Sequence, residues 1–205
     1  MNFENINDLH KDVLREIGNI GAGNAATSLS AILNKKVNMD VPEISVLPFN
    51  KVVDIMGGAD NYVAGCFLEI SGEAPMSLLF VIPKESINLF ITVLLGLPPM
   101  EDNQELDEMS ISALKEITNI LAGSYLTALN GFTQIVFDTS VPAFAYDMAG
   151  AILGNALYLL GNVSDSALVI KSLFKEEDKE VDSHLFLLPE PGTLEAIFEK
   201  LGVSV

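Results

Sequence analysis

Apolar residues recur at helical spacing close to the N-terminus of the chain. They follow an i, i+3, i+4 pattern after Asn7, a residue type suited to cap a helix, and the pattern ends near the basic residues 35–36. We therefore expect a helix over residues 8–34. Its expected core face consists of Val13, Leu14, Ile17 and Ile20.

The segments after this helix have the apolar runs and turn residues of β-structure. Pro42 is expected to interrupt or end the first strand, because proline cannot donate to a sheet ladder. Gly96 is expected to end the last helix of the unit. The predicted elements are a strand over 37–47, a short helix over 51–56, a hairpin of strands 63–70 and 75–82, and a helix over 84–95.

The same order of elements then begins again. Residues 100–108 form an acidic linker in which Asp107 is a candidate helix cap. Residues 12–29 and 112–129 are identical at nine of eighteen positions. The offset between the copies grows from 100 to 106 towards the C-terminus, so we expect an insertion within residues 147–165, where a longer helix is predicted.

This duplication predicts the fold class. Two repeats, about 8–99 and 107–203, are expected to bury their apolar faces against each other within a single domain, 1–205. We expect an α/β (α+β) pseudo-two-fold unit with one mixed β-sheet backed by helices. The two long helices would lie antiparallel or crossed on the outside.

A polar stripe accompanies the repeat at a fixed spacing. An oxygen-bearing side chain, a glutamate four residues later and an asparagine three residues after that lie on one side of a helix, and a proline follows. Packing alone would preserve the apolar positions and let the surface drift, so the recurrence of this surface indicates function. The two sets are Asp12, Glu16, Asn19 and Pro42, and Ser112, Glu116, Asn119 and Pro142.

The residue types of the stripe restrict its chemistry. An asparagine amide both donates and accepts hydrogen bonds, so it can orient a water molecule for attack on a phosphoryl group. A glutamate cannot usefully attack such a group, because both are anionic, but it can pair with a lysine. A single Glu-x-x-Asn is typical of an ordinary solvated helix; only the repetition favours a site.

The other candidate motifs give weaker indications of function. His10 and His184 stand in unrelated contexts and are expected to be exposed or structural, so the chain offers no dense metal-ligand cluster. Gly18, Gly21 and Gly23 interrupt a helix rather than follow a strand, which argues against a phosphate-binding loop. Only Gly23 recurs, as Gly123, and we interpret that pair as close helix packing.

Composition narrows the partners. The chain has 205 residues, 49% of them hydrophobic, and a formal net charge of −17. Such a charge repels nucleic acid and anionic membranes; it suits a basic protein patch, or solubility alone.

Cys66 lies in an apolar run and is expected to be buried. The uncharged runs 17–34 and 117–137 contain polar residues that argue against membrane insertion. Because no signal sequence is recognisable at the N-terminus, we expect a cytoplasmic protein.

At residues 16–27, Glu-Ile-Gly-Asn-Ile-Gly-Ala-Gly-Asn-Ala-Ala-Thr, and in the doubled spacing of the stripe, the sequence resembles the CheC family of bacterial chemotaxis phosphatases, which is related to CheX and FliY. The resemblance implies a CheC-like fold and a hydrolase acting on the aspartyl phosphate of the response regulator CheY. Glu16 and Glu116 would hold a regulator lysine, and Asn19 and Asn119 would align the attacking water near the regulator's own Mg²⁺. The chain itself would need no cofactor, and the two prolines would shape the backbone.

The resemblance also implies a second partner and a rival function. Family members bind the receptor deamidase CheD, for which the stretch Asp147–Met148 is a candidate contact; an ordinary aspartate at a helix start is the alternative. The rival function is a non-catalytic binding module, either a CheD adaptor or a flagellar-switch component. The end of the sequence at Val205 favours a freestanding protein over a FliY-type protein with an added domain. Thr118, where the first copy has Gly18, is a candidate to narrow the second site.

Overall fold

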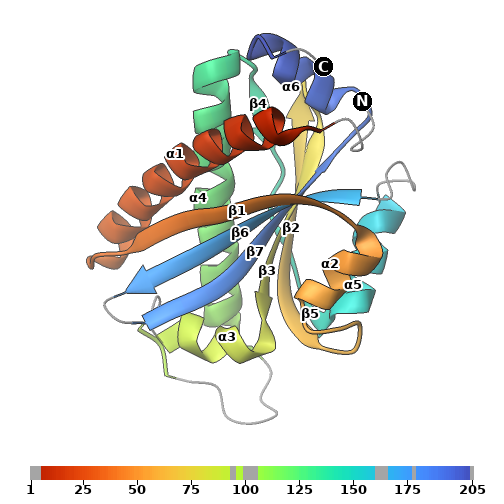
Figure 1. The fold of residues 1–205 in the computed structure, drawn as a ribbon. Coiled ribbons are helices and arrows are strands. Elements are labelled where there is room, and N and C mark those ends of the chain that lie inside the picture. Colours follow the sequence, from red (N-terminus) through yellow and green to blue (C-terminus); the bar gives the residue numbers. More distant parts are fainter. Residues whose placement is uncertain (1–5, 93–95, 99–105, 160–165, 177–178, 204–205) are drawn as a thin grey trace.

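The computed structural model describes residues 6–92, 96–98, 106–159, 166–176 and 179–203. Helices and strands alternate in the order expected of a duplicated unit (Figure 1). The helices are α1 (Asp8–Leu33), α2 (Phe49–Ile55), α3 (Lys84–Phe90), α4 (Glu108–Thr133), α5 (Ala149–Leu159) and α6 (Thr193–Lys200). The strands are β1 (Asn38–Pro48), β2 (Tyr62–Gly72), β3 (Met76–Pro83), β4 (Phe137–Thr139), β5 (Ala143–Met148), β6 (Ser166–Glu176) and β7 (Lys179–Pro189).

The strands form one sheet in which the two halves of the chain exchange their first strands. The order is β1-β6-β7-β3-β2-β4, and β5 also pairs with β2. β1 of the first half pairs with β6 of the second, whereas β4 and β5 of the second half pair with β2 of the first. The central pair, β3 with β7, joins equivalent strands. The order of elements therefore reads the same from either edge, as a pseudo-two-fold arrangement requires.

The α/β class with one sheet backed by helices is confirmed, but the strand directions differ from the mixed sheet that we expected. All the described pairings are antiparallel. The physical reason is the hairpins: β2–β3 and β6–β7 are consecutive strands, and tight turns join antiparallel neighbours. The exchange then adds the first strand of each half to the outer side of the other half's hairpin.

A β-bulge recurs at the two prolines of the motif. Between Asp40 and Glu43 the chain advances three residues while its partner β6 advances two. Between β4 and β5 the chain advances four residues while its partner β2 advances three. Pro42 and Pro142 lie within these two bulges, where the missing N–H costs no ladder hydrogen bond. β1 therefore continues past Pro42, contrary to a strand end there, whereas the second copy divides into β4 and β5.

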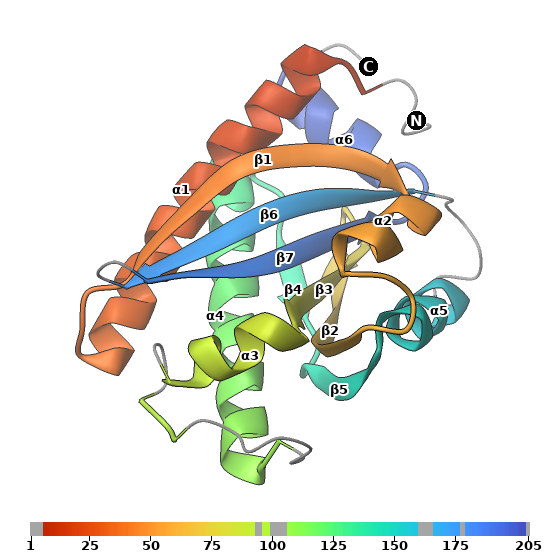
Figure 2. The ribbon, with the colours of Figure 1, turned by 60° about the horizontal axis from the view of Figure 1, so that its bottom comes forward.

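Helices cover both faces of the sheet, and α1 and α4 cross on one of them (Figures 1 and 2). The larger core lies under α1, α4, α3 and α6. A second core lies on the opposite face, where α2 and α5 pack together. β3 is buried on both sides, with Leu78 and Phe80 in the larger core and Leu79 and Val81 in the smaller one. The expectation that the two long helices lie antiparallel or crossed on the outside is thus confirmed in its crossed form.

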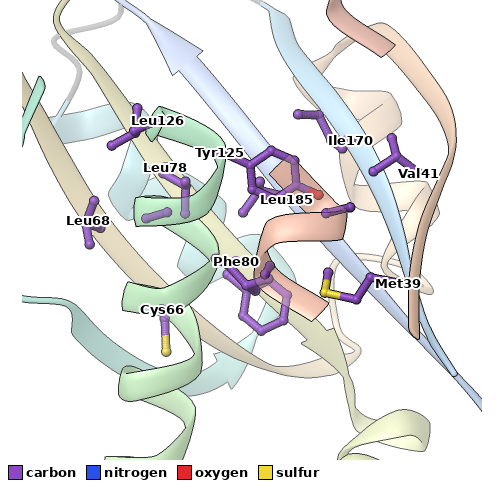
Figure 3. Close-up of a cluster of buried hydrophobic side chains, with 14 of the residues drawn as sticks. Met39, Val41, Cys66, Leu68, Leu78, Phe80, Tyr125, Leu126, Ile170 and Leu185 are labelled. Carbon is purple, nitrogen blue, oxygen red and sulfur yellow. The ribbon is translucent and has the colours of Figure 1, made fainter. Parts of the chain in front are cut away.

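α1 and α4 approach each other closely at Gly21. A Cβ atom at this position would lie 2.7 Å from Cδ1 and 3.0 Å from Cα of Tyr125. Figure 3 shows Tyr125 projecting from α4 into the larger core, above Phe80 and Leu185 of the sheet. Gly23 and Gly123 have nothing within 4 Å of such an added atom, so the interpretation of that pair as close packing is wrong. The unrepeated glycine provides the close approach.

Several boundaries refine the sequence prediction. α5 has 11 residues against 7 in its counterpart α2, which agrees with the longer helix expected in the second copy. α3 is described as an α-helix only to Phe90, and residues 100–105 of the predicted linker 100–108 lie outside the described residues. Ile20 is 37% exposed rather than buried, because the buried face of α1 is centred near Leu14 and Ala25 and Ile20 lies on the other side.

Candidate functional site

Side-chain caps fix the start of each helix that carries a polar stripe. Asn7 accepts a hydrogen bond from the backbone of His10 at 3.1 Å, and the His10 ring accepts one from the backbone of Asn7, also at 3.1 Å. Asp107 accepts a hydrogen bond from the backbone of Ser110 at 2.8 Å. These caps satisfy backbone groups that a helix start leaves unpaired. They set the same phase for α1 and α4, so equivalent positions face solvent in both.

The stripe residues are exposed in both helices. The structure places Asp12, Glu16 and Asn19 on the solvent side of α1, and Ser112, Glu116 and Asn119 on the solvent side of α4. The glutamate and asparagine of each pair lie about 4.5 Å apart along the helix axis, since three residues separate them. Within the described residues neither Glu16 nor Glu116 has an ion-pair partner. Both carboxylates are therefore available to a cation of a partner protein.

Asn19 is held in place by the strand that contains Pro42. Its side-chain oxygen accepts a hydrogen bond from the backbone N–H of Val41 at 3.3 Å. The amide nitrogen of Asn19 makes no hydrogen bond with the described part of the chain, so it can donate to a bound group. The bulge at Pro42 is thus connected to Asn19 by the hydrogen bond from Val41, the residue before the proline. Asp12 is engaged differently, in an ion pair with Arg15 at 2.8 Å.

The second site has a different setting. Among the described residues Asn119 makes no hydrogen bond corresponding to that of Asn19, and the residue before Pro142, Val141, is 86% exposed. Asn119 instead borders an open groove of about 580 Å³ at the crossing of the two helices. Sequence reasoning did not identify this groove, because it forms only where the helices cross. Its lining residues are Asn24, Thr27, Ser28, Asn119, Ile120, Gly123, Ser124 and Thr127.

Thr118 does not narrow the second site. Its side chain is 0% exposed, and its hydroxyl donates to the carbonyl of Leu114 at 2.8 Å on the core side of α4. Cys66 of β2 is buried, as expected. Burial raises the pKa of the Cys66 thiol to about 11, against the smaller lowering effects of Thr118 and of Lys115. This cysteine therefore stays protonated at neutral pH.

The remaining candidates lie apart from the stripes. Asp147 and Met148 are exposed at the end of β5, on the side of the molecule that α2 and α5 cover. Asp147 accepts a hydrogen bond from the backbone of Met148 at 2.7 Å, directly before α5 begins. His10 is buried against Phe198, with ring centroids 4.4 Å apart, so it is structural.

The described residues contain neither a metal-ligand cluster nor a membrane-spanning helix. No group of three or more histidine, cysteine, aspartate or glutamate side chains in this part of the chain could hold a metal ion. Likewise, none of the helices in the described segments is long and apolar enough to cross a membrane.

The sequence matches the CheC-like family twice, over residues 9–46 and 109–146, and each match runs from a stripe to just beyond its proline. It is also 42% identical over 207 residues to the CheY-P phosphatase CheC of Bacillus subtilis (strain 168), and the match covers 99% of each chain. The chain belongs to the CheC-like family. The two stretches of this CheC-like protein that match the family model contain the two copies of the repeated motif.

Solved structures support the fold of this CheC-like protein. Thermotoga maritima FliY has a TM-score of 0.75 at 21% identity, and the match covers 97% of this chain and 98% of that one. Borrelia burgdorferi CheX, solved as a CheX–CheY–BeF3–Mg²⁺ complex, has a TM-score of 0.51 at 18% identity, and the match covers 83% of this chain and 96% of that one. At these identities the likeness concerns the fold alone.

Proposed function

We propose that this chain is a protein phosphatase that hydrolyses the aspartyl phosphate of the response regulator CheY. The observation that carries the proposal is the 42% identity, along 99% of both chains, with a protein named CheY-P phosphatase. The two exposed Glu–Asn pairs on α1 and α4 supply groups that suit this reaction. Both repeats would act within one domain, because each half completes the sheet of the other.

In the proposed mechanism Glu16 and Glu116 anchor the regulator. Each exposed carboxylate pairs with a lysine of CheY and so fixes the asparagine one turn further along against the phosphoryl group. Asn19 and Asn119 then orient the water that attacks phosphorus, since an amide can direct a water without exchanging a proton with it. Neither group performs acid–base chemistry, so the gain in rate comes from position.

The Mg²⁺ of the reaction is proposed to belong to the regulator. The described residues of this chain contain no metal-ligand cluster. The related CheX was solved together with CheY, BeF3 and Mg²⁺. The ion would neutralise charge on the phosphoryl oxygens, while this chain contributes the carboxylate and the amide. We also propose that the protein is cytoplasmic, in the same compartment as its regulator substrate.

Hydrolysis by single and double asparagine variants tests the mechanism. Acyl-phosphate loss from phosphorylated CheY would be followed with Asn19→Ala, Asn119→Ala and the double variant. We expect each single variant to retain the activity of the other site. In the double variant, the acceleration of CheY-P decay above the regulator's own rate should fall by about hundredfold or more. Asn50→Ala is the matched control, because it removes an exposed amide from α2, on the opposite face of the sheet.

The same assay separates catalysis from docking. A double variant that still binds phosphorylated CheY but leaves its decay at the regulator's own rate supports a phosphatase. Full activity of the double variant would exclude the roles given to Asn19 and Asn119. A wild-type chain that binds the regulator without accelerating its decay would instead support a non-catalytic binding module.

We further propose that CheD binds around Asp147 and Met148. Both side chains are exposed beside Tyr62, and the rings of Tyr62 and Tyr146 lie 5.5 Å apart on the neighbouring strands. The bond from Met148 to Asp147 also fits the simpler role of an aspartate at a helix start. Titration calorimetry with CheD distinguishes the two: Met148→Ala should weaken binding by about tenfold. Val141→Ala, an exposed apolar control before β5, should not.

A further inference from the structure

A second cleft lies on the face of the sheet that carries α2 and α5, opposite the face covered by α1 and α4. Its volume is about 600 Å³, within the range of small-molecule sites. Glu43, Lys171 and His184 stand opposite one another on β1, β6 and β7, so their side chains share this face. The lining residues are Glu43, Ser45, Leu47, Ile55, Pro83, Glu85, Ser86, Val169, Lys171, Asp182 and His184.

The charged groups of the cleft leave an excess of negative charge. Lys171 pairs with Asp182 at 3.3 Å. Glu43 and Glu85 have no ion-pair partner within the described residues. An anion would meet three carboxylates and one lysine that is already paired, whereas a cation would meet two unpaired carboxylates. The charge therefore favours a cation.

His184 provides an independent observation at the same place. Its ring borders the cleft and is 6% exposed, and its Nδ1 is, in the described part of the chain, the one buried side-chain nitrogen or oxygen without a hydrogen-bond partner. Burial lowers the pKa of this imidazole, so the ring is neutral and one of its nitrogens is an acceptor. A buried polar group without a partner is costly unless something supplies one.

Apart from Ser45 and Ser86, the remaining lining is apolar. Leu47, Ile55, Pro83 and Val169 contribute aliphatic surface beside the carboxylates. A metal ion would gain nothing from such surface, and no cluster of potential metal ligands occurs among the described residues. A ligand that has both a charged head and an aliphatic stem would use all the groups present.

We propose that this cleft binds a small organic cation, a guanidinium or primary ammonium group on a short aliphatic chain. The cationic head would donate to Glu43, Glu85 and His184, and the stem would lie against the apolar residues. This chemistry occurs both in free amines and in the side chain of an arginine or lysine of another protein. The site is independent of the proposed phosphatase reaction.

Binding to the full chain tests the proposal directly, without a measurement of hydrolysis. Butylguanidinium would be titrated into ¹⁵N-labelled protein at about 0.15 M salt, which screens general attraction to the acidic surface. We expect saturable shifts at Ser45, Lys171 and the His184 ring. 1-Butanol has the stem without the charge, and butanoate has the opposite charge; neither should produce these shifts. A blocked Gly-Arg-Gly peptide distinguishes a protein side chain from a free cation.

Variants localise the binding. Glu43→Gln and Glu85→Gln should each weaken butylguanidinium binding by about tenfold. Glu69→Gln, the same change at an exposed position of β2, should leave it within twofold. Because these three side chains are exposed, the variants should fold. Absence of saturable shifts at the cleft, equal weakening by Glu69→Gln, or binding of butanoate as strong as that of the cation would each overturn the proposal.

Discussion

The side-chain oxygen of Asn19 accepts a hydrogen bond from the backbone N–H of Val41 at 3.3 Å, and this bond connects the helix of the first site to the bulge at Pro42. It gives a physical reason for the distance between Asn19 and Pro42 in the first copy of the motif; the described part of the second copy has no corresponding bond. Pro42 restricts the backbone at its own position and at Val41. The N–H of Val41 donates to the side-chain oxygen of Asn19. The amide of Asn19 is thereby oriented before any partner binds.

Replacing Pro42 should therefore impair the first site specifically. In an Asn119→Ala background, where only the first site would act, we expect Pro42→Ala to lower CheY-P hydrolysis by about tenfold, because the N–H of Val41 would hold Asn19 less firmly. Pro48→Ala, at the far end of the same strand, is the control. Equal rates for the two proline variants would contradict the positioning role of the bulge.

Two of the three glycines of α1, Gly21 and Gly23, should respond to substitution in opposite directions. Gly21→Ala would place a Cβ 3.0 Å from the backbone of Tyr125, so we expect a loss of about 1–3 kcal/mol in the free energy of unfolding. Gly23→Ala meets no atom within 4 Å and should gain up to about 1 kcal/mol from better helix propensity. Urea denaturation of the two variants measures both. A shift of both midpoints in the same direction would refute the close crossing at Gly21.

Thr118 should affect stability and not the second site. Because its side chain is fully buried, Thr118→Gly removes packing and introduces a glycine within a helix, at a combined cost of about 2 kcal/mol. In an Asn19→Ala background, hydrolysis per folded molecule should stay within twofold. A several-fold rise in that rate would restore the hypothesis that Thr118 obstructs the second site.

The buried thiol predicts a pH dependence at alkaline pH. The pKa of Cys66 is raised from 9.0 to about 11 by burial, so the unfolded thiol ionises first and pulls the equilibrium towards unfolding. The stabilisation is complete below pH 9 and is lost as the pH rises towards 11. We expect wild type to lose of the order of 2 kcal/mol more than Cys66→Ala across this window.

Chemical denaturation at several pH values measures that difference. Tyr125, whose pKa burial raises to about 12, titrates in both proteins, so its contribution cancels. Parallel stability curves for wild type and Cys66→Ala would show that the thiol is not buried as described.

The sequence alone was sufficient for the repeat, the long helices, the hairpins and the exposed stripe. These features depend on spacing along a short stretch, and periodicity records which side of a helix or strand faces the core. The helix starts at Asn7 and Asp107 were predictable for the same reason, because a cap acts within three residues. The roles of Glu16, Asn19 and their counterparts remain predictions.

Only the tertiary structure decided which distant groups meet. The exchange of first strands between the halves, the contact of Gly21 with Tyr125 and the bond from Val41 to Asn19 each join segments that carry no mark of one another in the sequence. Ile20 is exposed although it is apolar, and His184 borders a cleft although no motif surrounds it. Pairing between strands and crossing of helices depend on the shape of whole surfaces, which local periodicity does not specify.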